Sequence, residues 1–471
     1  MANREKINLI SEDKHHIWHP FTQMADWIKD IPSAPMIIKA GKGVYLYDSR
    51  GKKYIDGISS LWVNLHGHRK KEIDNAIKKQ IGKVSHSTFL GLTHEPAIEL
   101  AEELVQLSPK ELSRVFYSDN GSTSVEVALK MAYQYWQQKT KKSDKTMFLS
   151  LKNAYHGDTI GSVSVGGMDL FHTKFKSLLF DVCFASSPYC FRCKHRKNEC
   201  IFDYTKGFKN HCTSLGCKGQ CIESVKNLMQ KNHKNLAGAV VESMVQGAAG
   251  MITMPPGYMK EFEVLCKRYG VLLICDEVAT GFGRTGKMLA IEHENIRPDF
   301  LCLSKSITGG YLPLAATIVA EKIYSAFLGK YEEYKTFFHG HTYTANPLAC
   351  AAALANLKIF KRENVLKKLK HKINCLKSQL QNLQNLPNVG NIRQLGFMIG
   401  IEIVKNKFSG KGFEPKEKVG AKICALCRPK GLIIRPLGDV LVLMPPLSIS
   451  NAEITRMIKI VKNSINEYFL K

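Results

Sequence analysis

Two short apolar runs that end near charged residues constrain the fold more than any other feature of this chain. Val271 to Cys275 is followed by Asp276, and Phe300 to Leu303 is followed closely by Lys305. Short continuous apolar runs predict strands that are covered on both faces, as in a parallel sheet between helices. Ligands of such sheets bind at the carboxyl ends of the strands, where Asp276 and Lys305 would lie.

A lysine at such a strand end can be chemically active. Partial removal from water lowers the pKa of an amine, so neutral Lys305 could attack a carbonyl carbon and form a Schiff base. An acid beside it, such as Asp276, could keep the nitrogen of a pyridine ring protonated. The alternative is a solvated lysine just beyond a strand, which is the commoner situation for a lysine considered alone.

Strand-like and helix-like segments alternate around these runs, which predicts parallel βαβ units and an α/β fold. The other expected strands of the sheet are 115–117, 147–151 and 239–242, and the expected helices are 72–81, 96–107 and 125–137. We expect an N-terminal unit at 1–75 with a hairpin at 43–48 and 53–56, a large domain at 76–344, and a C-terminal α+β unit at 345–471.

Bulk properties exclude several classes of protein. The N-terminus lacks an apolar signal core, and the longest apolar runs, such as 312–320, are too short to cross a bilayer, so we expect a cytoplasmic protein without membrane contact. The formal net charge of +26 raises the alternative of a metal-dependent nucleic-acid-binding protein. Because the lysines are spread along the chain without interleaved aromatic residues, we predict no nucleic-acid partner.

A helix start that could hold a phosphate follows the strand expected at 115–117. Thr123 and Glu126 form a capping-box pattern, which marks a helix N-terminus. Gly121 would let the backbone approach a ligand, and the free amides of Ser122 and Thr123 with the helix dipole favour a phosphate. An ordinary capped helix is the alternative.

Tyr155 follows another expected strand, so its ring could stack on a flat heteroaromatic ligand at the same sheet edge. Glu242 and Asp158 could support the site or serve as structural caps. Amides for a phosphate, an aromatic face, an acid for a ring nitrogen and a lysine for an aldehyde together indicate pyridoxal 5'-phosphate.

Over nearly its whole length the chain resembles the class III aminotransferases of fold type I. The strings that carry the resemblance are HIWHPFT at 16–22, YHGD at 155–158, DEVATGFGRTG at 276–286, HGHTY at 339–343 and IRPLG at 434–438. The resemblance implies a large domain with a mostly parallel seven-stranded sheet between helices, and a small α+β domain built from both termini. It also implies a homodimer.

The resemblance assigns roles to individual residues. Lys305 would carry pyridoxal phosphate, Asp276 would pair with its ring nitrogen, and Tyr155 would stack on the ring. The phosphate would be held by Gly121 and Ser122, with His341 and Thr342 contributed by the other subunit.

The same strings are similar to the branch of the family that aminates 8-amino-7-oxononanoate in biotin biosynthesis. Arg435 is our candidate for the substrate carboxylate because a guanidinium binds a carboxylate through two hydrogen bonds, and Arg284 is the weaker candidate. Gly340 would leave room for the substrate chain. Another class III ω-aminotransferase acting on diamines or amino acids is the alternative.

The amino donor stays open between S-adenosylmethionine and lysine. In place of a tyrosine and the first of two tryptophans found in enzymes that use S-adenosylmethionine, this chain has Phe21 and Leu61, so Trp62 stands alone. Loss of a hydroxyl and an aromatic wall weakens recognition of a large polar ligand, and we favour lysine.

A cysteine-rich insert at 187–223 stands apart from the resemblance. Its cysteines are Cys190, Cys193, Cys200, Cys212, Cys217 and Cys221, with His195 and His211 nearby. Without an export signal we expect reduced thiols or metal ligands. The spacing fits no standard framework, and cysteine is used freely elsewhere as a small apolar residue, so both a structural metal and a metal-free loop remain open.

Overall fold

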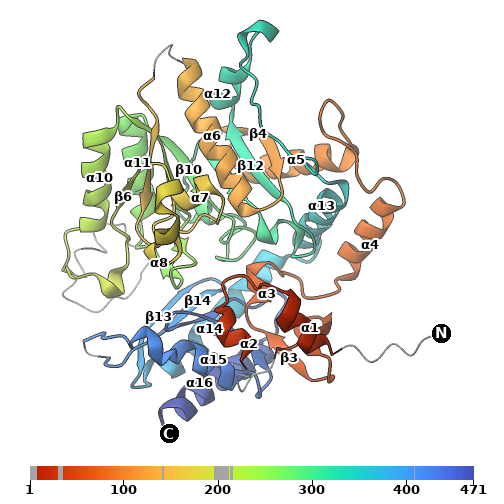
Figure 1. Cartoon of the computed structure of the whole chain (residues 1–471), viewed down its shortest axis with the longest axis vertical. Helices are drawn as coiled ribbons and strands as arrows, with labels where there is room; N and C mark the ends of the chain where they lie inside the picture. The colour runs from red at the N-terminus through yellow and green to blue at the C-terminus, as the bar shows by residue number, and fades with distance from the viewer. Residues whose placement is uncertain are drawn as a thin grey trace.

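A seven-stranded sheet forms the centre of the upper part of the molecule in the computed structural model, which describes residues 8–29, 35–139, 143–195, 212, 216–407 and 409–470 (Figure 1). From edge to edge its strands are β4 (Leu112–Ser118), β12 (Ala315–Ala320), β11 (Phe300–Leu303), β10 (Leu272–Asp276), β7 (Leu236–Glu242), β5 (Met147–Leu151) and β6 (Val182–Ala185). Strand β12 is antiparallel to both its neighbours, and the other paired strands are parallel. The predicted mostly parallel sheet is confirmed.

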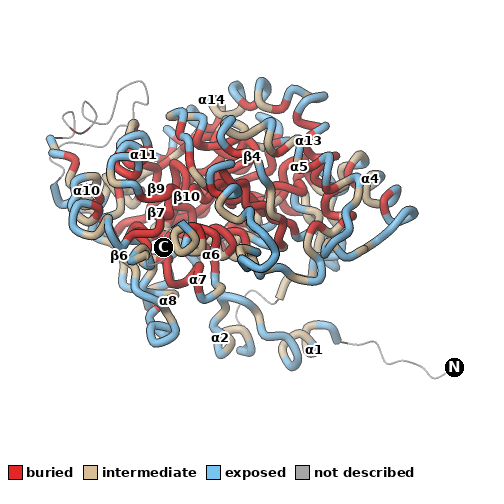
Figure 2. Tube along the Cα trace, turned by 90° about the horizontal axis from the view of Figure 1, so that it is seen from above, coloured by how far each residue is buried: buried red, intermediate tan, exposed pale blue. Residues whose placement is uncertain are grey.

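Helices cover this sheet. Helix α6 (Gly121–Lys139) packs on β12, β11, β10 and β7, α11 (Tyr258–Tyr269) packs on β10, α10 (Gln220–Asn232) on β6, and α5 (Glu95–Leu107) on β4. Helix α11 ends at Gly270, whose φ of 61° is left-handed and suits a glycine, and the chain then enters β10 directly. The buried residues gather along the central strands (Figure 2), which therefore read as continuous apolar runs.

The two runs that constrained the fold are confirmed as β10 and β11, and every residue of both strands is buried. The strands expected at 115–117, 147–151 and 239–242 lie within β4, β5 and β7. Strand β12 was not predicted. Its sequence, AATIVA, is buried throughout and has no alternation that separates a strand from a buried helix.

The lower part of the molecule joins both ends of the chain, as predicted (Figure 1). The N-terminal strands β1 (Ile38–Lys42), β2 (Tyr45–Asp48) and β3 (Lys53–Asp56) are extended by the C-terminal β15 (Leu432–Ile433), parallel to β3. A second sheet has the order β13 (Val389–Leu395), β14 (Met398–Ile403), β17 (Val440–Leu443) and β16 (Arg435–Leu437). Helices α14 (Val365–Gln384), α15 (Val419–Cys427) and α16 (Asn451–Phe469) complete this part.

Helices α4 (Lys71–Ile81) and α13 (Pro347–Arg362) lie in the chain between the upper and the lower part of the molecule. Helix α13 packs against both α4 and α5. The boundary expected at residue 75 falls inside α4, and the division into units stays a prediction. The remaining α-helices and strands of the described residues are α1 (Leu9–His16), α2 (Met24–Ile28), α3 (Ser59–Trp62), α7 (Ile160–Ser164), α8 (Asp169–His172), α12 (Glu321–Tyr324), β8 (Val245–Gln246) and β9 (Ile252–Thr253). Among the residues described, no helix is long and apolar enough to cross a membrane.

Candidate active site

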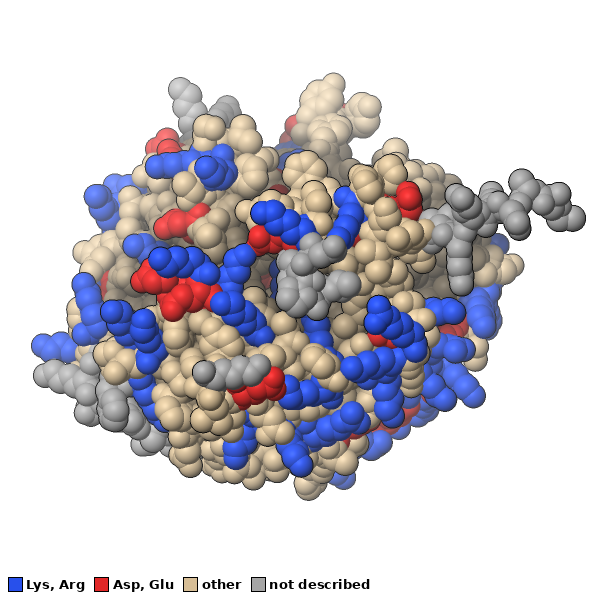
Figure 3. All heavy atoms as spheres, turned by 60° about the horizontal axis from the view of Figure 1, so that its bottom comes forward, with Lys and Arg blue, Asp and Glu red and all other residues tan. Residues whose placement is uncertain are grey.

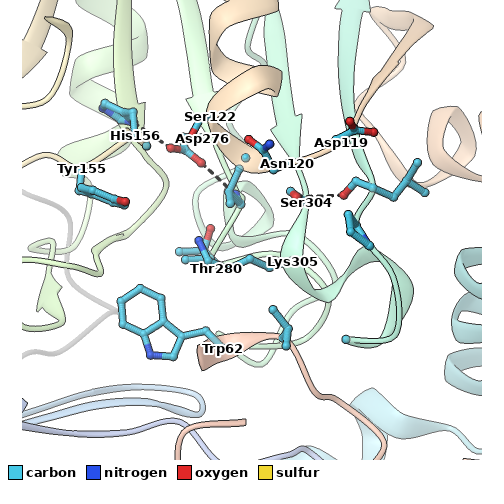
Figure 4. A pocket seen from close by; sticks show the side chains of 18 of the residues that line it. Trp62, Asp119, Asn120, Ser122, Tyr155, His156, Asp276, Thr280, Ser304 and Lys305 are labelled. Atoms are coloured by element: carbon cyan, nitrogen blue, oxygen red, sulfur yellow. Dashed lines mark hydrogen bonds and ion pairs between the residues drawn. The ribbon is translucent and has the colours of Figure 1, made fainter. Parts of the chain in front are cut away.

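A cavity of about 460 Å³ opens at the carboxyl ends of β7, β10 and β11. Its wall includes the ends of those strands, the start of α6 and the segment around Trp62. Figure 4 shows Asp276 and Ser122 on one side, Trp62 on the other, and Lys305 between them. The sequence-predicted residues that line it are Trp62, Gly121, Ser122, Tyr155, Glu242, Asp276 and Lys305. This is the position at which parallel sheets bind ligands.

Asp276 is held by a buried histidine. The Nδ1 of His156 lies 2.7 Å from Oδ2 of Asp276, and the amide of Val278 donates to Oδ1 at 2.9 Å. Both carboxylate oxygens are therefore engaged and the acid has a fixed orientation in the cavity wall. Sequence reasoning gave His156 no role, although it lies within the YHGD string beside Tyr155.

Lys305 lies just past β11, in a short 3-10 turn (Lys305–Thr308), with a left-handed φ of 42°. Its Nζ is 5.6 Å from the centre of the Trp62 ring. Burial lowers the pKa of Lys305, and the nearby charges of Asp276 and Glu242 oppose that shift. A larger share of this amine is therefore neutral, and nucleophilic, than for an exposed lysine.

Glu242 ends β7 directly beside Asp276 in the sheet register. Burial raises the pKa of Glu242 to about 7, although the amides of Tyr155 and Gly247 donate to its two oxygens at 3.1 and 2.8 Å and favour the charged form. The side chain thus changes charge near neutrality. The hydrogen bond that Glu242 accepts from the amide of Tyr155 fixes the backbone of Tyr155, the residue predicted to face the cofactor ring.

The start of α6 is a backbone cradle. A Cβ on Gly121 would lie 2.5 Å from Cγ1 of Val278, so only glycine fits there. Asn120 caps the helix: its Oδ1 accepts from the amide of Thr123, whose Oγ1 accepts from the amide of Asn120, each at 3.1 Å. The Thr123 amide is therefore engaged. At this helix start, the amides of Gly121 and Ser122 have no partner among the described residues. The expected capping box of Thr123 with Glu126 is not formed, because Glu126 accepts a hydrogen bond from Thr159.

A row of aromatic contacts leads from the cavity to Arg435. The ring centres of Tyr155 and Phe171 are 6.1 Å apart, those of Phe171 and Phe21 are 5.5 Å apart, and the guanidinium carbon of Arg435 is 5.9 Å from the Phe21 ring. No salt bridge involves Arg435 within the described ranges. Phe171, on α8, was missed by sequence reasoning because a single aromatic residue in a polar segment carries no pattern.

Trp62 is placed by an unusual turn. Ser59, Ser60, Leu61 and Trp62 all have left-handed φ values, between 48° and 73°. The amide and hydroxyl of Ser60 donate to the buried carboxylate of Asp56 at 2.8 and 2.7 Å. Trp62 is buried against the cavity, whereas Leu61 is 46% exposed.

Arg284 does not line the cavity. It is fully buried and donates to Oγ of Ser59 at 3.2 Å, to the carbonyl of Pro445 at 3.0 Å and to that of Asn64 at 2.9 Å. Burial lowers the pKa of Arg284 to about 9. The structure therefore places this arginine behind the left-handed turn and outside the cavity wall.

The segment that contains Gly340, His341 and Thr342 lies at the edge of the site. Nδ1 of His341 is 3.4 Å from the carboxylate of Asp119, which lines the cavity, while Gly340 and Thr342 are exposed. A Cβ on Gly340 would meet no atom of the described residues within 4 Å. The predicted contribution of these residues to a partner's site stays a prediction.

The cysteines of the insert lie elsewhere. Cys190, Cys193, Cys212, Cys217 and Cys221 line a separate small cavity, and none of them is in a disulfide. Cys200 and His211 lie outside the described residues, and His195 is exposed. Among the described residues no group of three or more metal-ligating side chains stands in a metal-binding arrangement.

Comparison with known proteins identifies the family. Residues 29–465 match the family model for aminotransferase class III. The chain belongs to the class III aminotransferases. These are pyridoxal-phosphate enzymes. The residues around the cavity fit that cofactor, because within the described residues the cradle at Gly121 offers two unpaired amides and Nε2 of His156 is buried without a partner.

Three similar proteins cover almost the whole of this aminotransferase. The adenosylmethionine-8-amino-7-oxononanoate aminotransferase of Geobacter sulfurreducens is 46% identical, over 99% of both chains. The structure of the enzyme of that name from Methanocaldococcus jannaschii is 42% identical, with a TM-score of 0.89 and 98% of each chain covered. An (S)-enantioselective omega-transaminase from Thermomicrobium roseum is 32% identical, also with a TM-score of 0.89 and 98% of each chain covered.

Proposed function

We propose that this aminotransferase converts 8-amino-7-oxononanoate to 7,8-diaminononanoate in biotin biosynthesis. The observation that carries the proposal is the near-complete match to relatives that are named for this substrate, at 46% identity over 99% of the chain. The omega-transaminase matches the same fold at lower identity. The site geometry agrees with a transaminase, and the choice of substrate depends on the relatives.

We assign cofactor contacts to the residues of the cavity wall. The free amides of Gly121 and Ser122 would hold the phosphate of pyridoxal phosphate, and Tyr155 would face its ring. Asp276, fixed by His156, would hold the ring nitrogen in its protonated form. When bound, the cofactor supplies an aldehyde that reacts with amines and a ring that accepts an electron pair.

Lys305 is the proposed nucleophile and proton carrier. Lys305 lines the cavity, and burial lowers the pKa of its ammonium group, so a larger share of the amine is neutral than for an exposed lysine. Such an amine can take a proton from the donor's carbon and return it to the acceptor's carbon. Trp62 forms the wall opposite Asp276 and restricts water on that side (Figure 4).

Arg435 is the proposed partner of the substrate carboxylate. It carries no salt bridge in the described part of the chain, and the contacts through Phe21 and Phe171 connect it to Tyr155 at the cavity. A guanidinium without an ion-pair partner among the described residues, at the end of a row of aromatic rings, suits a substrate with a carboxylate at the far end of an aliphatic chain.

We infer that lysine is the amino donor, whereas the names of the relatives specify adenosylmethionine. The basis is Phe21, a ring without a hydroxyl that contacts Phe171 and Arg435 outside the cavity wall, and Leu61, which is half-exposed beside Trp62. A sulfonium ligand with polar groups gains less from such apolar side chains than the simple chain of lysine does.

We also propose that the enzyme is a homodimer. Two large apolar side chains that flank His341 in the sequence, Phe338 and Tyr343, are strongly exposed. Exposed apolar groups that gather in one region mark an interface. A partner seated there would bring His341 and Thr342 close to a second phosphate cradle.

Incubation of the purified holoenzyme with 8-amino-7-oxononanoate and either lysine or S-adenosylmethionine tests both assignments. We expect 7,8-diaminononanoate, measured by mass spectrometry, and loss of the visible cofactor absorbance when lysine alone is added. Product formed only with S-adenosylmethionine would reject the donor. Absence of the diamine with both donors, together with turnover of simple ω-amines, would reject the substrate and favour an ω-transaminase.

A further inference from the structure

Helix α13 has an amide side chain in its buried face. Asn356 is fully buried, whereas the other buried residues of this helix are apolar, among them Ala352, Leu357 and Phe360. Asparagine is unfavourable in the interior of a helix, and a buried amide without partners is costly. Helix propensity and apolar packing therefore do not explain Asn356, and the explanation lies in its hydrogen bonds.

The side chain of Asn356 holds the turn that begins at Lys305. Its Nδ2 donates to the carbonyl of Ser306 at 3.0 Å and to the carbonyl of Ile307 at 2.9 Å. Both carbonyls belong to the 3-10 turn Lys305–Thr308, whose first residue has the left-handed φ of 42°. A residue other than glycine keeps that conformation only where the surrounding structure holds it. Asn356 supplies two of the hydrogen bonds that do so.

A histidine fixes the direction in which the amide of Asn356 points. Nε2 of His66 lies 2.7 Å from Oδ1 of Asn356. Burial lowers the pKa of His66 to about 4, so its ring is neutral near pH 7 and carries a single N–H. Because Nδ2 of Asn356 donates to two carbonyls, Oδ1 is the acceptor and the proton of His66 lies on Nε2. The buried pair therefore has one satisfied orientation.

The side chain of Lys305 depends on this turn for its direction. Among the residues that the structure describes, its Nζ has no hydrogen bond or ion pair, and the centre of the Trp62 ring lies 5.6 Å away. The turn is also tied to Trp62, because Oγ of Ser306 donates to the carbonyl of Trp62 at 3.3 Å. The backbone that Asn356 holds thus sets where the amine lies relative to the cavity wall.

We propose that Asn356, oriented by His66, is a positioning residue for Lys305. It fixes the strained turn, so that the amine of Lys305 reaches the same point of the cavity in each step of the reaction. A nucleophile that is held in place reacts faster, because less order has to be gained in the transition state. The proposal rests on the proposed role of Lys305 as nucleophile and proton carrier, and it is independent of the identity of the donor and the acceptor.

Addition of pyridoxal phosphate to the full-length enzyme, after the cofactor has been removed, tests this role without any substrate. We expect the visible cofactor absorbance to appear about 10-fold more slowly in Asn356→Leu than in the wild type, because the amine meets the aldehyde from a less defined position. In turnover, kcat should fall about 10- to 100-fold, whereas the KM for either substrate should change less.

Leu357→Ala is the matched control. It removes a buried side chain from the same helix, but Leu357 lines a separate cavity with Leu107 and Met288. The control variant should have a lower melting temperature, because a buried apolar side chain is lost, and wild-type rates of cofactor attachment and turnover. A variant that is destabilised without a change in these rates is the result expected of a merely structural residue.

His66 provides a second test if Asn356→Leu folds poorly. His66→Leu leaves Oδ1 of Asn356 without a donor and should also slow cofactor attachment. His66→Gln keeps an N–H donor in this position and should restore most of the wild-type rate. Wild-type attachment rates in Asn356→Leu or in His66→Leu would overturn the proposal.

Reduction of the wild-type holoenzyme with borohydride, followed by mass spectrometry of its peptides, separates this proposal from the proposed function. We expect the reduced cofactor on Lys305. Cofactor on Lys305 together with unchanged rates in the variants would overturn the positioning role of Asn356 alone. Cofactor on a different lysine would overturn both the proposed role of Lys305 and the positioning role.

Discussion

At the residue scale, the two acids that end β10 and β7 differ in environment although they are neighbours in the sheet. Asp276 has a histidine partner at 2.7 Å, whereas Glu242 has only backbone amides. Burial raises the pKa of Glu242 to about 7, and the charge of Asp276 adds to that shift, whereas nearby His156 and the two amides oppose it.

The raised pKa makes stability depend on pH with a definite sign. A carboxyl whose pKa rises from 4.5 to about 7 on folding binds more protons in the folded state, so its contribution to stability is present at low pH and is lost as the pH rises through 7. We expect Glu242→Gln to reduce the fall in stability between about pH 5 and about pH 8, by up to roughly 3 kcal/mol. Melting temperatures across that range measure the effect.

Glu95→Gln is the control, because the side chain of Glu95 is 69% exposed. Its melting curve should keep the wild-type dependence on pH. Glu277, also buried and with its pKa raised to about 8, remains in both variants, so some dependence must persist. An unchanged slope in Glu242→Gln would show that Glu242 does not titrate in this range.

At the element scale, the left-handed turn Ser59–Trp62 is the part of the site that costs the most backbone energy. Each residue other than glycine in this conformation costs about 1 kcal/mol, and four occur in succession. Asp56 holds the turn from one side through Ser60, and Arg284 holds it from the other through Ser59. The strain is compensated by buried hydrogen bonds that place Trp62 in the cavity wall.

We therefore expect Arg284→Met to destabilise the enzyme by about 3 kcal/mol, because it leaves three buried oxygens without a donor. The released turn should also raise the KM for both substrates more than it lowers kcat, while cofactor absorbance is retained. Thermal melting and steady-state kinetics measure these effects. Arg114→Met, which removes an exposed ion pair with Glu321, is the control and should change neither. A stable Arg284→Met enzyme with unchanged KM would contradict this account.

The elements that sequence reasoning identified are those with a local signal. The apolar runs of β10 and β11 could be recognised because each carries its own pattern of burial, and the helix start was found near Gly121 although the capping box that predicted it is replaced by a cap of Asn120 with Thr123. The left-handed turn and the place of Arg284 could not be recognised from the sequence. Both depend on contacts with Met444 and Pro445, which are far away in the sequence, and with Asn64, which folds back on the turn. The position of Arg284 in the DEVATGFGRTG string therefore did not indicate the direction in which its side chain points.

At the scale of the whole molecule, both ends of the chain build one part. The parallel pairing of β15 with β3 joins residues that lie almost 380 positions apart. No sequence pattern predicts that pairing, although the resemblance to the family implied a small domain built from both termini. On the face drawn in Figure 3, lysine and arginine side chains are spread among acidic and uncharged ones instead of forming one uninterrupted basic patch. The high net charge is therefore distributed over this surface, as expected for solvated lysines.

Exposed apolar side chains near His341 lead to a prediction about the assembly of the whole molecule. Phe338 is 75% exposed and Tyr343 is 58% exposed, on either side of His341. We expect Phe338→Glu combined with Tyr343→Glu to shift the enzyme from dimer to monomer in light scattering, because burial of a charge without a partner at an interface is costly. If His341 completes a partner's phosphate cradle, cofactor affinity should fall in step with dissociation.

Leu470→Glu is the control for that double variant. Leu470 is 84% exposed but lies at the C-terminal end, far from the segment of Phe338 (Figure 1). Its charge should leave both the mass and the cofactor affinity unchanged. A double variant that stays dimeric would place the interface elsewhere. One that becomes monomeric yet binds the cofactor as tightly as the wild type would show that each chain completes its own cradle, with His341 held at Asp119 of the same chain.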